Sequence, residues 1–503
     1  MEESVKIKEN PASMANGCAK TPFWEKLALG VGQVPIFLGN TCAQSFAVPV
    51  FQMTLGLNLN IMAIAMFIPR LWDAFSDPVM GRISDNCRSR FGRRKPFIFV
   101  GAILMGLSFG AMWMVPEELK GNEMGLMAYM IGGMSLFYIC YTIYSVPFNS
   151  LTYEMTPDYD ERTKIGAYLG FFGKAGEFLY NWIFPLTGLA IFGSVMVGVR
   201  WVGWGVGLFL LLGLGLIPAI FVKERYQKVA SRQNKVAIIS SLKESLANRA
   251  FLVLLGISLC QVLAGMFTSQ IDYYLLVYYM SDGDVALGSV KKGLLSSGFS
   301  IVGIVGIPFV VWLAGKYSKE GAMIFVYVLA IVGGVLKWWI FTPGQWFPFV
   351  NDWVNAIPIL GNWIPDTKGV EFKILLDPLF SGIIWIALAM LTPAMLADVC
   401  DDDELRHGSR REGMFGAIYS FVTNLGFSIA LSLSFVALSL SGLDGKLAGA
   451  QSLETFQTMR IILSAAPVVF AVIGIWLLCR YPLTKKRNAE IRRELEKRRG
   501  EVT

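Results

Sequence analysis

The sequence predicts an all-α integral membrane protein, with twelve transmembrane helices in two pseudo-symmetric halves of six. Three observations predict this fold class. Only 16% of the 503 residues are charged and 54% are hydrophobic, whereas soluble domains carry roughly 25% charged residues. The mean hydropathy is +0.53. Several apolar runs approach the ~20 residues that cross a bilayer, and basic residues gather in alternate loops between these runs.

Each span is expected to be helical, because lipid offers no hydrogen-bond partner to free backbone groups. We predict spans at residues 25–52, 59–84, 96–115, 123–150, 166–192, 200–222, 250–279, 293–315, 321–342, 372–398, 412–440 and 458–481. Ten spans with two interfacial helices are the alternative. The first twenty residues are polar, so no cleavable signal peptide is expected.

The basic residues predict how the spans are oriented. Loops after the second and sixth spans and the tail after the twelfth are rich in Lys and Arg, whereas loops after odd-numbered spans are poor in them. The positive-inside bias then puts both termini and the central loop in the cytoplasm, in a cell membrane such as the bacterial inner membrane. It also explains the net charge of +7 without a nucleic-acid partner. The expected parts are a cytoplasmic tail 1–24, a six-helix half 25–222, a cytoplasmic linker 223–249, a second half 250–482 and a charged cytoplasmic tail 483–503.

The chain also repeats itself. Residues 154–172 read EMTPDYDERTKIGAYLGFF, and residues 397–421 read ADVCDDDELRHGSRREGMFGAIYSF. Both runs place an acidic cluster, then basic residues, then a Gly-aromatic helix start, after the fourth and the tenth span. Similar elements six spans apart indicate two related halves, which rock against each other around a site at the membrane midplane.

Cysteine and histidine usage excludes several kinds of site. Seven cysteines are scattered without a CxxC or Cys/His metal spacing, and His407 is the only histidine. We therefore expect no cofactor and no histidine relay, only Na⁺ or H⁺ as a coupling ion. The sequence has no GxxxxGK[ST] loop, so ATP-driven transport is not expected.

The strongest candidate site is a carboxylate pair within the second span, in the run PRLWDAFSDP. Asp73 and Asp77 are at positions i and i+4, so they share one face of a helix. Two such carboxylates repel in a low dielectric unless a cation lies between them or one takes a proton. We therefore predict a Na⁺ or H⁺ site, with Ser76 and an oxygen from the fourth span completing an oxygen shell and Arg70 neutralising the pair after the cation leaves. The alternative is structural: Arg70 bridges one aspartate, and Asp77 caps a helix broken at Pro78.

Other polar and aromatic residues inside the spans are candidates for substrate contacts. Lys174 and Glu177 form an i,i+3 pair that is either a structural ion pair or a substrate contact. Lys337 is expected to snorkel toward an interface, and Asp272 and Asp377 to lie near the outer surface. Aromatic faces with polar tips suit a sugar ring, although such faces also pack helices together. The candidate substrate contacts are Arg70, Tyr141, Ser145, Asn149, Lys174, Glu177, Trp182, Tyr419 and Asn424.

Three segments carry a resemblance to a known family: RLWDAFSDPVMGRISDNCRSRFGRRKPFI, YTIYSVPFNSLTYEMTPDYDERTKI and ADVCDDDELRHGSRREG. Together they resemble the glycoside–pentoside–hexuronide:cation symporters, the melibiose permease-like branch of the major facilitator superfamily. The resemblance covers most of the chain in order. It implies the two-half fold and cation-coupled sugar transport.

Carried over to this sequence, the resemblance implies roles for individual residues. Asp73 and Asp77 match the cation-binding aspartates of the family, and Thr142 matches a threonine ligand on the fourth span. Arg70 matches an arginine beside the sugar and cation sites. Arg406 falls where the melibiose permease has a functional lysine before the eleventh span.

The sequence also departs from the melibiose permease pattern. Ser76 stands in place of an asparagine ligand, which leaves the identity of the ion open. Ser145 replaces a sugar-binding aspartate, and Phe37 and Gly170 stand where that permease has an aspartate and an arginine. The melibiose-type sugar clamp is therefore largely absent.

Charged residues at matching cytoplasmic positions of the two halves are either solvated loop charges or ion pairs that latch a closed inner face. The latch is our hypothesis, because the positions are symmetric. The candidate gate residues are Arg93, Arg94, Asp158, Glu161, Arg162, Asp402, Arg406 and Arg410.

Taken together, the sequence predicts a monomeric secondary active symporter. Cation binding at Asp73 and Asp77, with Na⁺ favoured over H⁺, drives uptake of a sugar, glycoside, pentoside or uronide by alternating access. A cation-coupled carrier of an amphiphile such as a lysolipid is the alternative, since eukaryotic relatives of the resembling family carry one. A membrane prenyltransferase-like enzyme is the third, because WDAFSD and DVCDDDE superficially resemble motifs that hold Mg²⁺-diphosphate.

Overall fold

The computed structural model describes residues 21–155, 159–224, 247–344, 346, 371–407, 412–444, 447 and 449–499. Within these ranges the regular structure is helical, apart from one isolated bridge between Ser89 and Gly92. The candidate gate residues Asp158 and Arg410 lie outside the described residues, and so does most of the expected linker.

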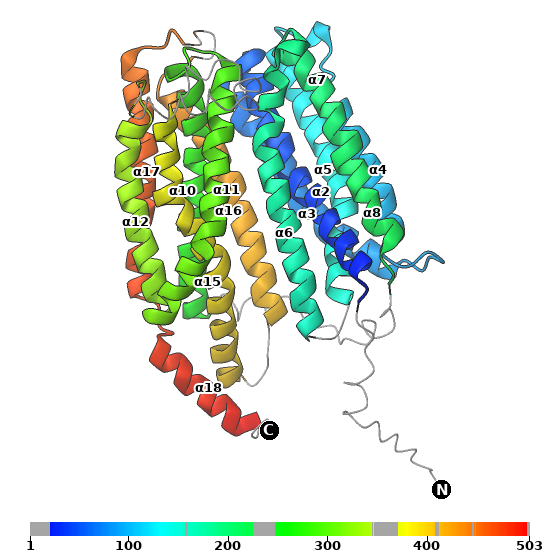
Figure 1. Cartoon of the computed structure of the whole chain (residues 1–503), viewed down its shortest axis with the longest axis vertical. Coiled ribbons are helices and arrows are strands. Elements are labelled where there is room, and N and C mark those ends of the chain that lie inside the picture. Colours follow the sequence, from blue (N-terminus) through cyan, green and yellow to red (C-terminus); the bar gives the residue numbers. More distant parts are fainter. Residues whose placement is uncertain are drawn as a thin grey trace.

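The first half of the chain folds into one bundle of helices. Its elements are α2 (Phe23–Ala47) with a π-helical continuation (Val48–Thr54), α3 (Leu59–Asn86), α4 (Lys95–Ala111), α5 (Glu123–Glu154), α6 (Tyr159–Ile183), and α7 (Val195–Gly205), which runs through a π-helical segment (Val206–Gly213) into α8 (Leu214–Phe221). Figure 1 shows these helices side by side, in blue to green.

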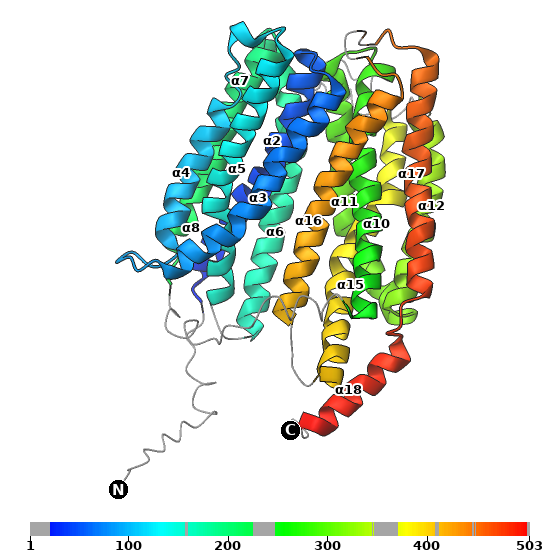
Figure 2. The same cartoon turned by 180° about the vertical axis from the view of Figure 1, so that it is seen from behind.

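The second half folds into a second bundle beside the first. Its elements are α10 (Arg249–Tyr274) with a π-helical turn (Leu275–Tyr279), α11 (Val285–Lys316), α12 (Lys319–Ile340), α15 (Leu376–His407), α16 (Glu412–Leu440), α17 (Leu453–Cys479) and α18 (Lys485–Arg499). The reverse view in Figure 2 shows the same division into two bundles. In both views α18 lies at one end of the molecule, where α2 begins and α17 ends; we call this the α18 end.

Each expected span coincides with a helical run of the described chain. Nine of these runs are apolar and long enough to cross a membrane, judged by length and composition over the described residues. Two further runs hold shorter apolar stretches, Leu59–Arg70 of α3 and Lys95–Ala111.

Several boundaries differ from the expectation, and α15 runs on to His407, beyond the expected end at residue 398. Helix α6 starts at Tyr159 rather than residue 166, and it ends at Ile183 because Pro185 opens a short 3₁₀ turn. Helix α11 starts at Val285 rather than residue 293, since the Asp284 carboxylate accepts the backbone N–H groups of the first turn at 2.8 and 3.1 Å. The expected charged tail 483–503 contains the helix α18, whose residues Ile491 and Leu495 are buried.

The bundles touch where α3 packs on α16, and where α6 and the 3₁₀ turn Pro185–Gly188 pack on α11. In the second contact, Asn181 Nδ2 donates to Ser300 Oγ across 3.2 Å, and Trp182 Nε1 donates to Ser297 Oγ across 3.0 Å. A Cβ atom at Gly293 of α11 would lie 2.8 Å from the Asn181 carbonyl oxygen, so this close approach requires glycine. We call these contacts the α6–α11 seam.

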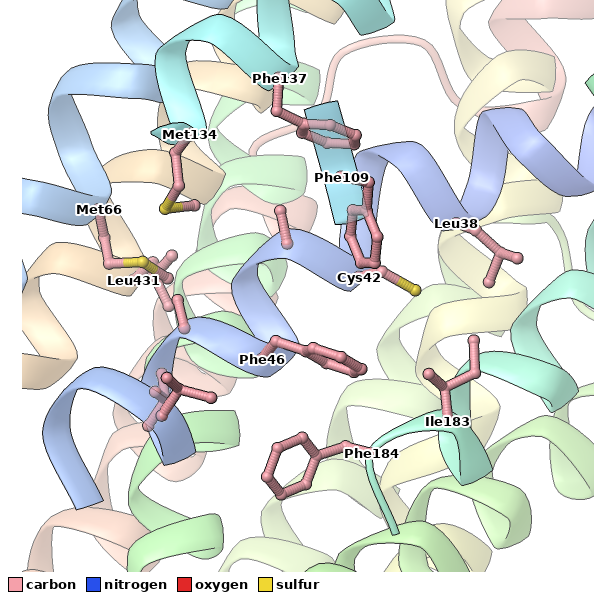
Figure 3. Packing of buried hydrophobic residues seen from close by; sticks show 14 of the residues in the cluster. Leu38, Cys42, Phe46, Met66, Phe109, Met134, Phe137, Ile183, Phe184 and Leu431 are labelled. Atoms are coloured by element: carbon pink, nitrogen blue, oxygen red, sulfur yellow. The ribbon is translucent and has the colours of Figure 1, made fainter. Parts of the chain in front are cut away.

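The hydrophobic core of the first bundle is built around aromatic side chains. Phe46 of α2 packs edge-on against Phe184, with ring centroids 5.4 Å apart, and contacts Phe109 and Trp113. Figure 3 shows the Phe46 ring between Phe109 and Phe184. The same cluster of buried residues includes Leu431 of α16, so apolar packing continues from one bundle into the other.

Candidate functional site

Three of the four expected cation ligands converge between α3 and α5. The Thr142 hydroxyl donates to Asp77 Oδ1 across 3.1 Å and lies 3.0 Å from the Ser76 hydroxyl. Thr142 is 1% exposed. One carboxylate and two hydroxyls within hydrogen-bond distance form a donor set of hard oxygen atoms, which suits a small cation such as Na⁺.

Asp73 lies one helical turn before Asp77 on the continuous helix α3. Its side chain is outside the described residues, so its contribution to the site remains a prediction. The backbone places both aspartates on one face of the helix, because residues i and i+4 of an α-helix align.

Arg70 ties α3 to α2. Its Nη1 donates to Asn40 Oδ1 across 2.7 Å, and its Nη2 donates to the Asn40 carbonyl oxygen. With the Gln44 amide turned so that its oxygen faces the guanidinium, that oxygen accepts from Arg70 Nε at 2.7 Å. The guanidinium also lies 4.6 Å from the ring centroid of Tyr138. Sequence reasoning missed Asn40 and Gln44, since neutral amides in an apolar span give a weaker signal than charges.

A cavity of about 960 Å³ runs between the two bundles, and Asp77 and Arg70 lie on its wall. Both halves line it, with Lys174 and Glu177 from α6 facing residues such as Lys292 from α11. Its aromatic lining residues are Phe37, Phe67, Tyr180, Phe184, Tyr273, Phe299, Trp385, Phe421 and Phe427. The candidate cation site therefore opens onto the cavity between the halves through Asp77.

The Lys174–Glu177 pair occupies the same cavity. Lys174 Nζ lies 2.6 Å from Glu177 Oε2, and Glu177 Oε1 accepts a hydrogen bond from Ser300 of α11 at 2.9 Å. The Lys174 side chain is 39% exposed. The pair is therefore a structural ion pair that also joins the two bundles, and it faces the cavity, where a substrate could contact it.

The remaining candidate substrate contacts fall into two groups. Asn424 lines the central cavity, and Asn149 lines a smaller hollow of about 460 Å³ that shares Lys174 and Glu177. The indole N–H of Trp182 donates a hydrogen bond to Ser297 in the α6–α11 seam. Tyr141, Ser145 and Tyr419 lie outside the lining of both spaces. The Tyr141 hydroxyl donates to the Ile36 carbonyl oxygen at 3.3 Å, and Ser145 is buried.

The described gate candidates make contacts within their own bundle. Glu161 pairs with Lys26 at 2.6 Å and Lys164 at 2.9 Å, and hydrogen bonds from these two lysines hold the pKa of Glu161 at about 2. Arg406 pairs with Asp402 one turn earlier on α15 at 2.8 Å. The side chain of Arg162 is outside the described residues.

Arg93 and Arg94 belong to a helix cap that sequence reasoning missed. The Glu224 carboxylate accepts the backbone N–H groups of Arg93, Arg94 and Lys95 at 2.7, 2.8 and 2.9 Å, so it caps the N-terminus of α4. Gly92 has φ +114°, and a Cβ atom there would lie 2.7 Å from Glu224 Oε1. The bond joins residues more than a hundred positions apart, so local patterns give no sign of it.

Charged side chains of the second half contradict one expectation. Lys337 is 4% exposed and pairs with Asp377, which is fully buried, so Lys337 does not snorkel to an interface. Asp272 is 5% exposed and lies 2.5 Å from Lys292 on the cavity wall, and the place of Asp272 and Asp377 near the outer side of the membrane stays a prediction. Burial of a charge in a membrane helix requires a partner, and each residue has one on a neighbouring helix. Lys337 was misplaced because its partner is distant in sequence.

Two helical bundles around a shared cavity with charged and aromatic walls are the arrangement of a membrane transporter of the major facilitator type. The model of the family "MFS/sugar transport protein" matches residues 28–485. The chain therefore belongs to this family. A family of transport proteins argues against the membrane-enzyme alternative.

Characterised and uncharacterised symporters align along nearly the whole chain. An uncharacterised symporter of Synechocystis is 25% identical and covers 97% of this chain and 99% of its own length. The putative glycoside/cation symporter YagG of Escherichia coli is 24% identical, with 88% of each chain covered. The sodium-dependent lysophosphatidylcholine symporter 1 of Gallus gallus is 25% identical over 95% of this chain and 89% of its own.

Solved structures share the fold. A bacterial homologue of the human lysosomal transporter Spinster, inward-facing and occupied, superposes with a TM-score of 0.61 and 13% identity, covering 92% of this chain and 97% of its own. The D-xylose-proton symporter gives a TM-score of 0.58 at 13% identity, with 90% and 97% covered. The protein is thus a multi-pass membrane protein of the major facilitator fold.

Proposed function

We propose that the protein is a cation-coupled symporter that moves a sugar or glycoside across a cell membrane by alternating access. The observation that carries the proposal is that the hydroxyls of Ser76 and Thr142 converge beside Asp77, which lies on the wall of the cavity between the halves. Relatives named as glycoside/cation symporter, isoprimeverose transporter and glucuronide carrier support the substrate class. The basic loops support an orientation with the α18 end in the cytoplasm.

The proposed coupling follows from charge. An empty site leaves Asp77, and Asp73 on the same face of α3, with excess negative charge in a low dielectric. Na⁺ bound among the carboxylates and the hydroxyls of Ser76 and Thr142 removes that excess. A bound cation also stabilises the contact between α3 and α5, which shapes the cavity wall beside Arg70 and so favours substrate binding. The coupling is reciprocal, so substrate raises Na⁺ affinity by the same factor.

The α6–α11 seam supports an assignment of the conformation. Its hydrogen bonds join the two halves toward the end opposite the α18 end. With the α18 end in the cytoplasm, the outer side is the closed one, and the structure represents an inward-facing state. The gate candidates Glu161 and Arg406, paired within their own bundles here, would then be the charges available to latch the inner side in the opposite state.

The test is uptake by proteoliposomes under an imposed Na⁺ or H⁺ gradient, with a panel of radiolabelled pentoses, methyl glycosides and methyl uronides. Wild-type protein is expected to accumulate at least one of them with Na⁺. Asp73→Asn and Asp77→Asn are expected to abolish accumulation and keep the fold, monitored by thermal unfolding. Accumulation at the full wild-type rate in Asp77→Asn would contradict the cation site.

A second candidate is a cation-coupled carrier of a lysolipid. The sodium-dependent lysophosphatidylcholine symporters among the relatives favour it, and so does the set of nine aromatic side chains on the cavity wall. Na⁺-dependent uptake of lysophosphatidylcholine that no sugar competes with would support this candidate over the first. The cation site and its test are the same for both.

A further inference from the structure

Four charged side chains from four different helices gather in the second half. Asp272 of α10 pairs with Lys292 of α11 at 2.5 Å, and Lys337 of α12 pairs with Asp377 of α15. Ser381 Oγ donates to Asp377 Oδ1 across 2.8 Å. The two pairs lie within electrostatic reach of each other, since the charges of Lys337 and Asp377 act on Asp272. We call these four residues the charge quartet.

The stability of the folded protein does not by itself explain why these four charged residues are present. Asp272, Lys337 and Asp377 are at most 5% exposed, and burying charges costs several kcal/mol per ion before pairing offsets it. Well-packed apolar side chains often hold helices together as firmly as a buried ion pair. Ionisable groups inside a membrane bundle are therefore functional by default, and their position tells which function they serve.

Three of the four residues of the charge quartet line the central cavity, and Asp377 lies behind them, hydrogen-bonded to Ser381 of the cavity wall. Asp272, Lys292, Lys337 and Ser381 all belong to the wall of the cavity onto which Asp77 opens from the other half. The Lys292 side chain is 26% exposed. Its ammonium group has three donors and uses two within the protein, on Asp272 and on the Ser269 carbonyl oxygen at 3.0 Å. One donor remains for a molecule in the cavity.

The chemistry of this wall selects a neutral molecule rich in hydroxyl groups. A simple cation beside Asp272 is repelled by Lys292, and a simple anion beside Lys292 is repelled by Asp272. A hydroxyl group both donates and accepts, so adjacent hydroxyls satisfy a carboxylate and an ammonium group together. Tyr273 and Ser289, whose hydroxyls lie 2.8 Å apart on the same wall, add further donors and acceptors.

We propose that the charge quartet is the second-half subsite for the hydroxyl groups of a neutral polyhydroxylated substrate. Asp272 and Lys292 contact the substrate, and Lys337 and Asp377 are positioning residues that hold this front pair through charge and packing. The proposal rests on the proposed symport function and adds to it: the substrate bridges Arg70 of one half and Asp272–Lys292 of the other. Binding across both halves links recognition to their relative movement.

The test measures KM and maximal rate in proteoliposomes for the neutral methyl glycosides, methyl β-D-xyloside and methyl β-D-galactoside, that the wild type accumulates. Loss of a hydrogen bond to a charged group changes affinity by about 10- to 100-fold, so Asp272→Asn and Lys292→Gln are each expected to raise KM by about tenfold or more. Two measures of Na⁺ binding are expected to stay within about twofold of the wild type. One is the Na⁺ concentration that gives half the maximal rate, extrapolated to saturating glycoside. The other is the thermal stabilisation by Na⁺. Asp377→Asn is expected to raise KM with the maximal rate retained.

A charge exchange separates binding from a purely structural ion pair. The double variant Asp272→Lys/Lys292→Asp keeps a pair of opposite charges but reverses donor and acceptor toward the cavity, so KM is expected to stay high. Lys316→Gln is the matched control on α11, because Lys316 stacks on Trp312 and Tyr317 and lies outside the cavity wall. Its KM is expected to equal that of the wild type.

Each outcome decides between the proposals. A wild type that accumulates glycoside, with folded Asp272→Asn and Lys292→Gln variants of unchanged KM, overturns the subsite alone. Wild-type KM in the charge-exchange variant overturns it too, because a structural pair then suffices. A wild type that accumulates no glycoside under any gradient contradicts the proposed function, and the subsite with it. Na⁺-induced stabilisation identifies variants that have failed to fold.

Discussion

The Thr142 hydroxyl of α5 donates a hydrogen bond to the Asp77 carboxylate of α3 across 3.1 Å. This contact makes the candidate cation site a property of two helices rather than of one motif. A cation held there draws α3 and α5 together, and α3 also contacts α16 of the other half. Occupancy of the site is therefore expected to influence the packing of the two bundles.

Replacement of Thr142 by valine tests this contact. Thr142→Val keeps the shape of the side chain but removes the oxygen, so the apparent Na⁺ affinity is expected to fall by about 10- to 100-fold. The measurement is the Na⁺ dependence of the transport rate or of thermal stability. Thr142→Ser keeps the hydroxyl and is expected to stay within a few-fold of the wild type. Equal Na⁺ affinity in the valine variant would remove Thr142 from the ligand set.

The α6–α11 seam predicts a shift in conformational equilibrium. Ser300→Ala removes the partner of both Asn181 and Glu177, and two hydrogen bonds contribute about 1–3 kcal/mol. The population open at the end opposite the α18 end is therefore expected to rise by about 5- to 150-fold from its low starting value. A cysteine at cavity residue Ser289, in a background without the seven native cysteines, reports this opening by its labelling rate with a membrane-impermeant maleimide.

Ser296→Ala is the control for the seam. Ser296 is one turn away on α11 and lines the cavity, while its side chain makes no hydrogen bond to α6 among the described residues. Labelling is expected to match the wild type in this variant. Equal labelling of Ser300→Ala and Ser296→Ala would mean that the seam does not hold the halves closed.

The cap formed by Glu224 predicts a loss of stability. Glu224→Gln removes the negative charge that faces three backbone N–H groups at the start of α4, which is expected to cost about 1–2 kcal/mol of the free energy of unfolding. Gly92→Ala is expected to be destabilising as well, through φ +114° and the contact with the Glu224 carboxylate. Thermal unfolding in detergent measures both. Glu118→Gln on the exposed loop is the control with an unchanged midpoint.

The ion pairs of Glu161 predict a pH dependence. Hydrogen bonds from Lys26 and Lys164 lower the pKa of Glu161 from 4.5 to about 2, so folding favours its ionised form. The stabilisation is therefore fully present above about pH 4.5 and is lost as the pH falls toward 2. The difference in unfolding midpoint between the wild type and Glu161→Gln is expected to be constant from pH 5 to pH 8 and to shrink below pH 4.5. A difference that grows on acidification would contradict this assignment.

The helices of the fold were predictable because they depend on local composition. Long apolar runs and alternating basic loops identify spans without reference to any distant residue, and the errors arose at ends fixed by single residues. Asp284 extends α11 by capping it, and Pro185 shortens α6. The expected division into residues 25–222 and 250–482 remains a prediction in its boundaries.

The candidate site was predictable only where its residues share one segment. Ser76 and Asp77 follow from one motif, whereas Thr142 came from resemblance to a family. Pairings across helices, such as Lys337 with Asp377, have no local signature, because an isolated charge in a span reads the same whether it is paired or near a surface. Trp182 shows the reverse limit: an indole suited to stacking on a sugar is used to hold the two halves together.

The composition of the α6–α11 seam affects how fast the two halves can separate and close in a transport cycle. Its hydrogen bonds involve serine hydroxyls, an amide and an indole N–H beside a glycine. As the halves part, water replaces each lost partner at once, so separation does not leave a dry surface that must be wetted. Such a junction opens by thermal motion, and the same hydrogen bonds form again each time it closes.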